Sequence, residues 1–159
     1  MNTLITFESF FGNTEQIARE IAVGLGLDPD RFVRRVSEVS AAQLEGIELL
    51  VVGSATRGFN VCPDTKAFLQ GIPRGALNGV DIAAFDTRID IETVDKGILT
   101  FMVKLFGYAA EKIDKRLKQV GGTPTVAHAG FIVEDSEGPL RDGELERARK
   151  WAQSILAAR

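Results

Sequence analysis

Cysteine, histidine, tryptophan and tyrosine each occur only once among the 159 residues of this chain. The single cysteine, Cys62, excludes a disulfide within the chain and a metal site built from several thiolates. The single histidine, His128, argues against a zinc site and against a Cys–His catalytic pair. We therefore interpret Cys62 as a small buried side chain and His128 as a structural residue with hydrogen-bonded ring nitrogens.

Long hydrophobic runs and a surplus of positive charge are also missing. The longest apolar runs, around residues 98–103 and 49–52, are far too short to span a bilayer. Residues 1–10 contain neither a basic flank nor a small-residue cleavage site, which argues against a signal peptide. The formal net charge of −3 argues against a nucleic-acid-binding surface. We therefore expect a cytoplasmic protein without a membrane span and without a nucleic-acid partner.

The sequence does contain a regular alternation of apolar runs and helical patterns. The apolar runs predict strands at residues 3–7, 31–36, 48–54, 80–86 and 124–133. Helical patterns lie at residues 14–25, 63–70 and 143–157, and in most of the segment that ends at about residue 120. This alternation predicts one α/β domain over residues 1–159, a three-layer sandwich around a five-stranded parallel sheet in the order 2-1-3-4-5. We predict Asn13 and Asp142 as the N-caps of the first and last helices.

The loop after the first predicted strand has the composition of a phosphate-binding site. A sheet of this order binds ligands at the carboxyl ends of its strands, so the loops after residues 7, 54 and 86 are the candidates. The first loop leads directly into a helix N-terminus with unpaired N–H groups, and Gly12 lets the backbone approach an anion closely. The predicted phosphate cradle consists of Ser9, Phe10, Phe11, Gly12, Asn13 and Thr14. It contains no Lys or Arg, which excludes a P-loop, and the alternative is a plain turn with a helix cap.

The stretch ITFESFFGNTEQIAREIA, residues 5–22, resembles the start of a flavodoxin-family protein. The phosphate loop of that family follows the pattern T/S-x-T-G-x-T. Ser9, Gly12 and Thr14 fit this pattern, whereas Phe11 replaces the middle hydroxyl residue. The resemblance extends from residue 3 to about residue 153. It implies a flavodoxin-like fold and flavin mononucleotide (FMN) as a non-covalently bound cofactor.

The second candidate loop offers a wall for the flat flavin ring. Its sequence VGSATRGFNVCP, residues 52–63, is similar to the GSPTRGF stretches of flavodoxin-family proteins. Phe59 is the candidate for contact with the ring face, and Gly58 would give close backbone approach. Arg57 would stabilise the anionic reduced flavin or contact substrate or phosphate, unless it is only a solvated surface residue. The predicted cofactor-binding residues of this loop are Ala55, Thr56, Arg57, Gly58, Phe59 and Asn60.

The third candidate loop departs from the electron-carrier flavodoxins, because the pattern Gly-Asp-x-x-Tyr is absent. The stretch AFDTRI instead resembles a less-studied branch of flavodoxin-domain proteins. In that branch Gly-x-Ala-Ala opens the next helix, and residues 107–110 match this motif. We predict Asp86, Thr87 and Arg88 as the third flavin-facing segment. Tyr108 is a further candidate near the flavin, or else a half-buried residue at the start of a helix.

Acidic and aromatic side chains gather around these loops in the sequence. A group of acidic residues would surround the site with negative charge and suit a basic partner surface: Glu8, Asp64, Asp86, Asp90, Glu92 and Asp95. Six of the ten phenylalanines lie in or beside the loops: Phe10, Phe11, Phe59, Phe85, Phe101 and Phe106. Their position predicts a flavin pocket that is drier and more apolar than in electron-carrier flavodoxins.

Three hypotheses for the function follow. The first is a flavodoxin-like redox protein that transfers electrons to a partner protein through bound FMN. The second is an FMN-dependent oxidoreductase acting on a small apolar substrate of the quinone or porphyrinogen type. The apolar segment 97–106 favours it, unless this segment is only core packing. The third is a flavodoxin-fold module without a cofactor that acts in regulation or assembly, which Phe11 favours.

Overall fold

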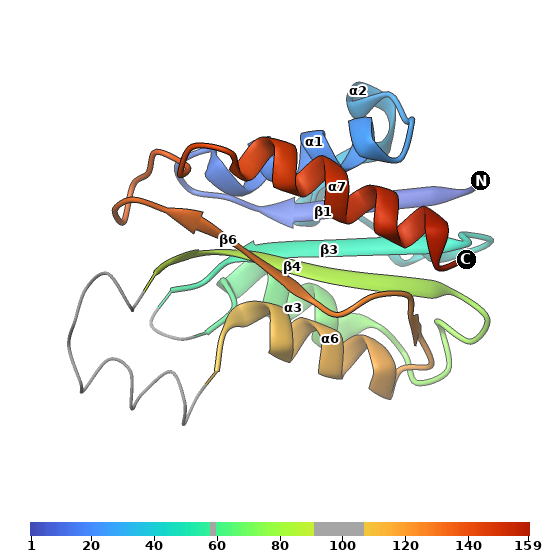
Figure 1. Ribbon diagram of the computed structural model, residues 1–159. Helices are drawn as coiled ribbons and strands as arrows, with labels where there is room; N and C mark the ends of the chain where they lie inside the picture. The colour runs from blue at the N-terminus through green and yellow to red at the C-terminus, as the bar shows by residue number, and fades with distance from the viewer. Residues whose placement is uncertain (58–59, 91–106) are drawn as a thin grey trace.

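The protein forms a central sheet covered by helices on both faces (Figure 1). The structure is a computed structural model that describes residues 1–57, 60–90 and 107–159. Gly58, Phe59 and the apolar segment 97–106, all with predicted roles, lie outside the described residues. Among the described residues, no helix is long and apolar enough to cross a membrane.

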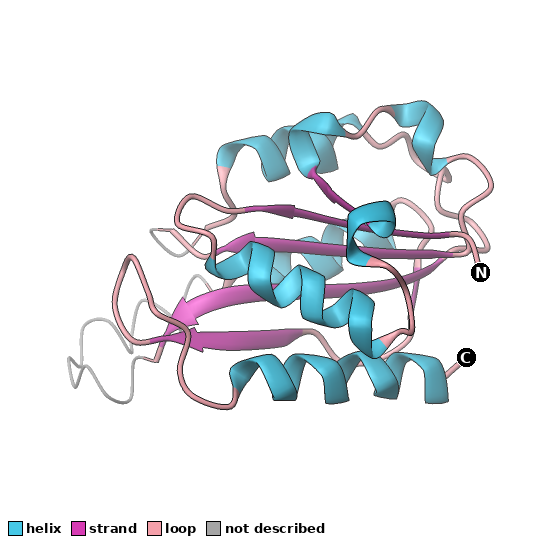
Figure 2. Ribbon diagram, turned by 90° about the horizontal axis from the view of Figure 1, so that it is seen from above, coloured by secondary structure: helices cyan, strands magenta, loops and turns pink. Residues whose placement is uncertain are grey.

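The strands pair in the order β2-β1-β3-β4-β5, and all of the pairings are parallel. The bounds are β1 (Thr3–Glu8), β2 (Val33–Arg35), β3 (Leu49–Ala55), β4 (Asp81–Ile89), β5 (Thr123–Pro124) and β6 (Ala129–Val133). Seen from above, the long strands β1, β3 and β4 end at the same edge of the sheet (Figure 2). This arrangement confirms the predicted fold class and strand order, with one additional strand.

Two of the predicted strands are longer in the prediction than in the structure. Residues 31–32 belong to a short helix, α2 (Pro29–Phe32), because Asp28 caps it by accepting a hydrogen bond from the backbone N–H of Asp30. The predicted strand 124–133 is divided into β5 and β6, which both pair with β4. Pro124 has no N–H to donate, and beyond it Thr125 directs both its N–H and its hydroxyl to Ile82 O.

His128 lies in the break between β5 and β6 rather than inside a strand. Its Nδ1 atom is buried and has no hydrogen-bond partner among the described residues. The prediction that both ring nitrogens are hydrogen-bonded was therefore wrong for Nδ1.

The helices divide the core into two layers (Figure 1). The principal helices are α1 (Asn13–Gly24), α3 (Pro63–Gly71), α6 (Ala109–Gln119) and α7 (Glu144–Ala157), with short turns η1 (Val36–Glu38) and η2 (Ala41–Leu44). Helices α1 and α7 cover one face of the sheet, and α3 and α6 cover the other. Successive residues of β3 alternate between the layers, because Val51 packs with α1 and α7 whereas Leu50 and Val52 pack with α3 and α6.

An aromatic cluster fixes α7 to the sheet. Phe85, Phe131 and Trp151 pack edge to face, with ring centroids 6.1–6.2 Å apart. The Trp151 indole also donates a hydrogen bond to Ala127 O in the break between β5 and β6. A Cβ atom on Gly53 would lie 2.0 Å from the Phe85 ring, so this ring fills the space of a missing side chain. Phe85 is therefore a core residue, and its predicted place beside the ligand loops was wrong.

The caps of the first and last helices also differ from the prediction. Gly12 and Gly143 are the N-caps of α1 and α7, with φ angles of +90° and +89°. A residue with a positive φ angle is strained unless it is glycine. The cap positions are therefore taken by these glycines and not by Asn13 or Asp142. Asn13 is instead the first residue of α1.

Candidate functional site

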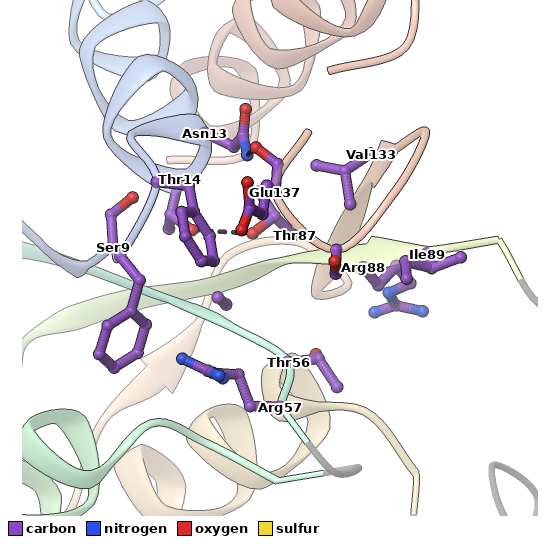
Figure 3. Close-up of a pocket in the computed structure, with 14 residues that line it drawn as sticks. Ser9, Asn13, Thr14, Thr56, Arg57, Thr87, Arg88, Ile89, Val133 and Glu137 are labelled. Atoms are coloured by element: carbon purple, nitrogen blue, oxygen red, sulfur yellow. Dashed lines mark hydrogen bonds between the residues drawn. The ribbon is translucent and has the colours of Figure 1, made fainter. Parts of the chain in front are cut away.

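A cavity of about 440 Å³ opens at the carboxyl ends of the strands, beside the N-terminus of α1 (Figure 3). All three predicted segments contribute to its wall, but the third is not a loop, because Thr87 and Arg88 belong to β4, which extends to Ile89. The predicted residues that line it are Ser9, Phe10, Phe11, Asn13, Thr14, Ala55, Thr56, Arg57, Thr87 and Arg88. Among the other described candidates, the cavity lining does not include Gly12, Asn60, Asp86 and Tyr108. The wall is completed by residues that the sequence did not suggest: Ile89, Val133, Ser136 and Glu137.

The loop after β1 presents backbone donors to this cavity. Gly12 turns the chain into α1, and its N–H donates to Ser9 Oγ at 3.0 Å. The next backbone N–H groups, those of Asn13, Thr14 and Glu15, have no acceptor among the described residues. The first N–H groups of a helix have no intrahelical partner and carry a partial positive charge. The start of α1 can therefore bind an anion without a Lys or Arg side chain.

Two hydroxyl groups meet beside these donors. Thr14 Oγ1 and Thr87 Oγ1 lie 2.8 Å apart, and their side chains point toward each other in Figure 3. Both residues are buried, with 1% and 4% of their surface exposed. Each hydroxyl has one proton to donate, and their mutual hydrogen bond uses only one of the two. The second proton is available to an acceptor in the cavity.

The loop between β6 and α7 closes the site from the side of α1. Asn13 Nδ2 donates to Glu137 O at 3.1 Å (Figure 3). A Cβ atom on Gly138 would lie 2.7 Å from the Asn13 side chain, so the loop packs tightly against the start of α1. The loop between β6 and α7 was not among the predicted loops, which followed the first, third and fourth strands. Only the general rule that ligands bind at the carboxyl ends of strands could have indicated this loop.

Aromatic rings and a cation form part of the cavity wall. Phe10 and Phe11 are about half exposed, at 50% and 52%. The Arg57 guanidinium lies 4.6 Å from the centroid of the Phe10 ring, a cation–π contact. Among the described residues Arg57 has no carboxylate partner, so none of these residues neutralises its positive charge.

At the end of β4, charged side chains are locked to one another. Asp86 accepts from Arg88 Nε at 2.6 Å and from Arg88 Nη2 at 2.7 Å. The backbone N–H of Ala110, in the first turn of α6, donates to the same carboxylate at 2.9 Å. The Arg88 guanidinium carbon lies 3.5 Å from the centroid of the Tyr108 ring. Asp86 and Tyr108 therefore hold Arg88 in place without lining the cavity themselves.

Burial shapes the protonation of this group. It raises the pKa of the Asp86 carboxyl, and the Arg88 guanidinium and the Ala110 N–H oppose this rise. Burial likewise raises the pKa of the Tyr108 hydroxyl, against the effect of Arg88. A carboxylate in such a place is costly to ionise unless it keeps its cationic partner.

The predicted ring of negative charge is wrong for two of its members. Asp86 is fully buried, and Glu8 is directed away from the cavity. The Glu8 carboxylate accepts from Thr65 N at 2.7 Å and from Thr65 Oγ1 at 2.8 Å, which satisfies the N-terminus of α3. Asp90 pairs with Arg141 at 3.1 Å. Glu92 and Asp95 lie outside the described residues.

Cys62 behaves as predicted. It is fully buried, and its Sγ donates to Ala55 O at 3.3 Å. Burial raises the pKa of its thiol, which disfavours the nucleophilic thiolate. The described residues also contain no group of three or more His, Cys, Asp or Glu side chains that could hold a metal ion.

The comparison with known families decides the relationship that the fold and the cavity suggest. The family model described as Flavodoxin matches residues 5–151. The chain belongs to the flavodoxin family. No curated protein sequence matches this family member.

Solved flavodoxin structures share its fold at low sequence identity. Oxidised Flavodoxin 1 from Bacillus cereus is 18% identical with a TM-score of 0.74, covering 98% of this chain and 97% of that chain. The flavodoxin, WrbA-like protein from Agrobacterium tumefaciens is 16% identical with a TM-score of 0.73, covering 99% and 96%. Rubredoxin oxygen:oxidoreductase from Desulfovibrio gigas is 18% identical with a TM-score of 0.69, covering 99% of this chain but 36% of that protein.

Proposed function

We propose that this flavodoxin-family protein binds FMN without a covalent bond and transfers electrons between redox partners. The observation that carries the proposal is the set of open backbone N–H groups at the start of α1, next to a buried pair of hydroxyls. When bound, FMN supplies one- and two-electron redox chemistry. The protein has to hold the phosphate, enclose the ring and exclude water.

The neutral donors of the cradle suit a phosphate group. The N–H groups of Asn13, Thr14 and Glu15 have no acceptor among the described residues, and the Thr14–Thr87 pair retains one free hydroxyl proton. Charge-assisted hydrogen bonds of this kind are about twice as strong as neutral ones. Phe11 stands where the family pattern has a hydroxyl residue, and Thr87 of β4 brings a hydroxyl to the same cavity.

The remaining wall suits a flat, partly apolar ring. A volume of about 440 Å³ falls in the ordinary range of small-molecule sites. The half-exposed rings of Phe10 and Phe11 provide apolar surface. Polar groups that could orient a ligand in such a site come from Thr56, Arg57, Arg88, Ser136 and Glu137.

The visible absorption spectrum of the purified protein, with flavin analysis after denaturation, tests the proposal. We expect FMN to be released, and we expect apoprotein to bind FMN at least about 100-fold more tightly than riboflavin, because hydrogen bonds to a charged group contribute about 1.5–3 kcal/mol each. Riboflavin is the matched control because it lacks only the phosphate. Equal affinities for the two flavins would contradict the phosphate cradle, and the absence of binding would contradict the function.

A substrate-specific oxidoreductase is the second candidate. The two half-exposed phenylalanine rings and the Arg57 guanidinium favour it, because the same groups can contact an aromatic substrate as well as the flavin. Steady-state oxidation of NAD(P)H with quinones, or oxidation of a porphyrinogen, would support this candidate. Electron transfer to a protein acceptor without turnover of either small molecule would support the carrier.

A further inference from the structure

Arg88 is held in one position by its neighbours. Its guanidinium forms two hydrogen bonds with Asp86 and stacks on the Tyr108 ring. A Cβ atom on Gly130 would lie 2.2 Å from the guanidinium carbon, so the space for Arg88 depends on glycine in the neighbouring strand β6. A planar guanidinium that is bonded along one edge and stacked on one face loses most of its freedom.

Of the Arg88–Asp86 pair, only the arginine lines the cavity. Arg88 lines the cavity and 17% of its side chain is exposed, whereas Asp86 does not line it and its side chain is 0% exposed. The Asp86 carboxylate is turned toward the N–H of Ala110 at the start of α6. Two of the five guanidinium N–H groups bond to Asp86, and among the described residues no other carboxylate or carbonyl accepts from Arg88.

We infer that Arg88 is a fixed cation of the flavin site that favours the reduced over the oxidised flavin, and that Asp86 limits this preference by neutralising part of its charge. The inference rests on the proposed function, because it concerns flavin bound in this cavity. Uptake of two electrons and one proton from a redox partner gives the flavin ring one negative charge. A cation fixed beside the ring stabilises that charge, and a low-dielectric wall strengthens the attraction.

The experiment compares the affinities of oxidised and reduced FMN in substituted proteins. In Arg88→Gln we expect affinity for reduced FMN to fall about tenfold more than affinity for oxidised FMN, equivalent to a two-electron midpoint potential lower by about 30 mV. In Asp86→Asn, which leaves the guanidinium charge uncompensated, we expect the ratio to shift in the opposite direction. In Arg88→Lys, which keeps the charge, we expect most of the wild-type ratio.

Arg147→Gln is the matched control. Arg147 also bonds to a buried carboxylate, Glu144, and lies over an aromatic ring, Phe131, but it does not line the cavity. We expect no change in the affinity ratio for this variant. If Arg88→Gln does not fold because Asp86 is stranded, the double variant Asp86→Asn with Arg88→Gln removes both charges together, and it should shift the ratio in the direction of Arg88→Gln.

Each outcome decides between the two proposals. Equal losses of affinity for both redox states in the Arg88 variants would overturn the inference and leave FMN binding intact. A wild-type protein that binds neither form of FMN would overturn the proposed function and the inference with it. Opposite shifts in Arg88→Gln and Asp86→Asn, with Arg147→Gln unchanged, would support both.

Discussion

The two sides of the cavity differ in how they are built. At the start of α1, neutral backbone N–H groups and hydroxyls face the cavity, and Gly12 is needed there for its backbone angle. At the end of β4, Arg88 lines the cavity while its partner Asp86 is buried behind it, and Gly130 is needed for the space that its missing side chain leaves to Arg88. Water can satisfy free N–H groups, whereas a buried carboxylate needs its cation at all times. We therefore expect the first side to govern affinity for the ligand and the second side to govern stability as well.

The largest expected effect is on the neutral side. Replacing Thr14 by Glu adds a negative charge to the cradle and removes a hydroxyl, so we expect affinity for FMN to fall at least about 100-fold, because like charges repel strongly in a partly buried site. Fluorescence titration with FMN measures this loss of affinity. The exposed Thr123→Glu, at the far end of the sheet, is the control.

Thr14 is buried, so a second substitution separates binding from folding. Asn13→Asp adds the charge in the first turn of α1, where a carboxylate is favourable for the helix. The substitution removes only the exposed hydrogen bond to Glu137 O, so we expect the variant to fold and still to bind FMN more weakly. Unchanged affinity in both variants would show that phosphate does not bind at the start of α1.

The second effect is on the charged side. We expect Asp86→Ala to lower the free energy of unfolding by about 3 kcal/mol, because it strands Arg88 and leaves the N–H of Ala110 without its acceptor. Urea denaturation measures the free energy of unfolding of the variant and of the wild type. Glu146→Ala is the control, since Glu146 and Lys150 form a pair in which both side chains are 71% exposed, and its loss should cost at most about 0.5 kcal/mol. Similar losses for the two variants would remove the distinction between the two sides.

The two glycines sharpen the comparison further. We expect Gly130→Ala to destabilise the protein by about 2 kcal/mol, because its methyl group would overlap the Arg88 guanidinium. Gly12→Ala meets no atom within 4 Å and should cost only the backbone strain of its φ angle, about 1 kcal/mol. Thermal denaturation of both variants tests the order, and a larger loss at Gly12 would reverse it.

The smallest expected effect concerns a carboxylate outside the cavity. Burial raises the pKa of Glu144, but Arg147 and the N–H of Ile132 outweigh burial, so the pKa lies below its ordinary value of 4.5. A lowered pKa in the folded state means that Glu144 stabilises the protein above about pH 4.5 and that this contribution is lost as the pH falls further. We expect Glu144→Gln to cost about 1 kcal/mol at neutral pH. Denaturation at several pH values should show this difference vanishing in acid, and a constant difference would contradict the assignment.

The strand order and the first two loops could be predicted because they depend on local pattern, whereas the predicted third loop lies inside β4. Apolar runs located β1, β3 and β4, and Pro63 and Gly71 bounded α3. The short helix before β2 and the break after Pro124 were missed, because single turns interrupt patterns that look continuous. The roles of Glu8 and Asp86 were missed for another reason. The Thr65 partner of Glu8 lies 57 residues away and the Ala110 partner of Asp86 lies 24 residues away, so no local pattern shows these two contacts. The Asp86–Arg88 pair is only two residues apart, but the sequence does not show that it is buried.

Trp151 gives the protein an optical reporter of its own. It is the only tryptophan, and its indole touches Phe85 and Phe131 and donates to Ala127 O across the break between β5 and β6. Selective excitation of tryptophan therefore observes one place, the contact of α7 with the far edge of the sheet. A red shift of its emission would mark the separation of α7 from β4 and β6.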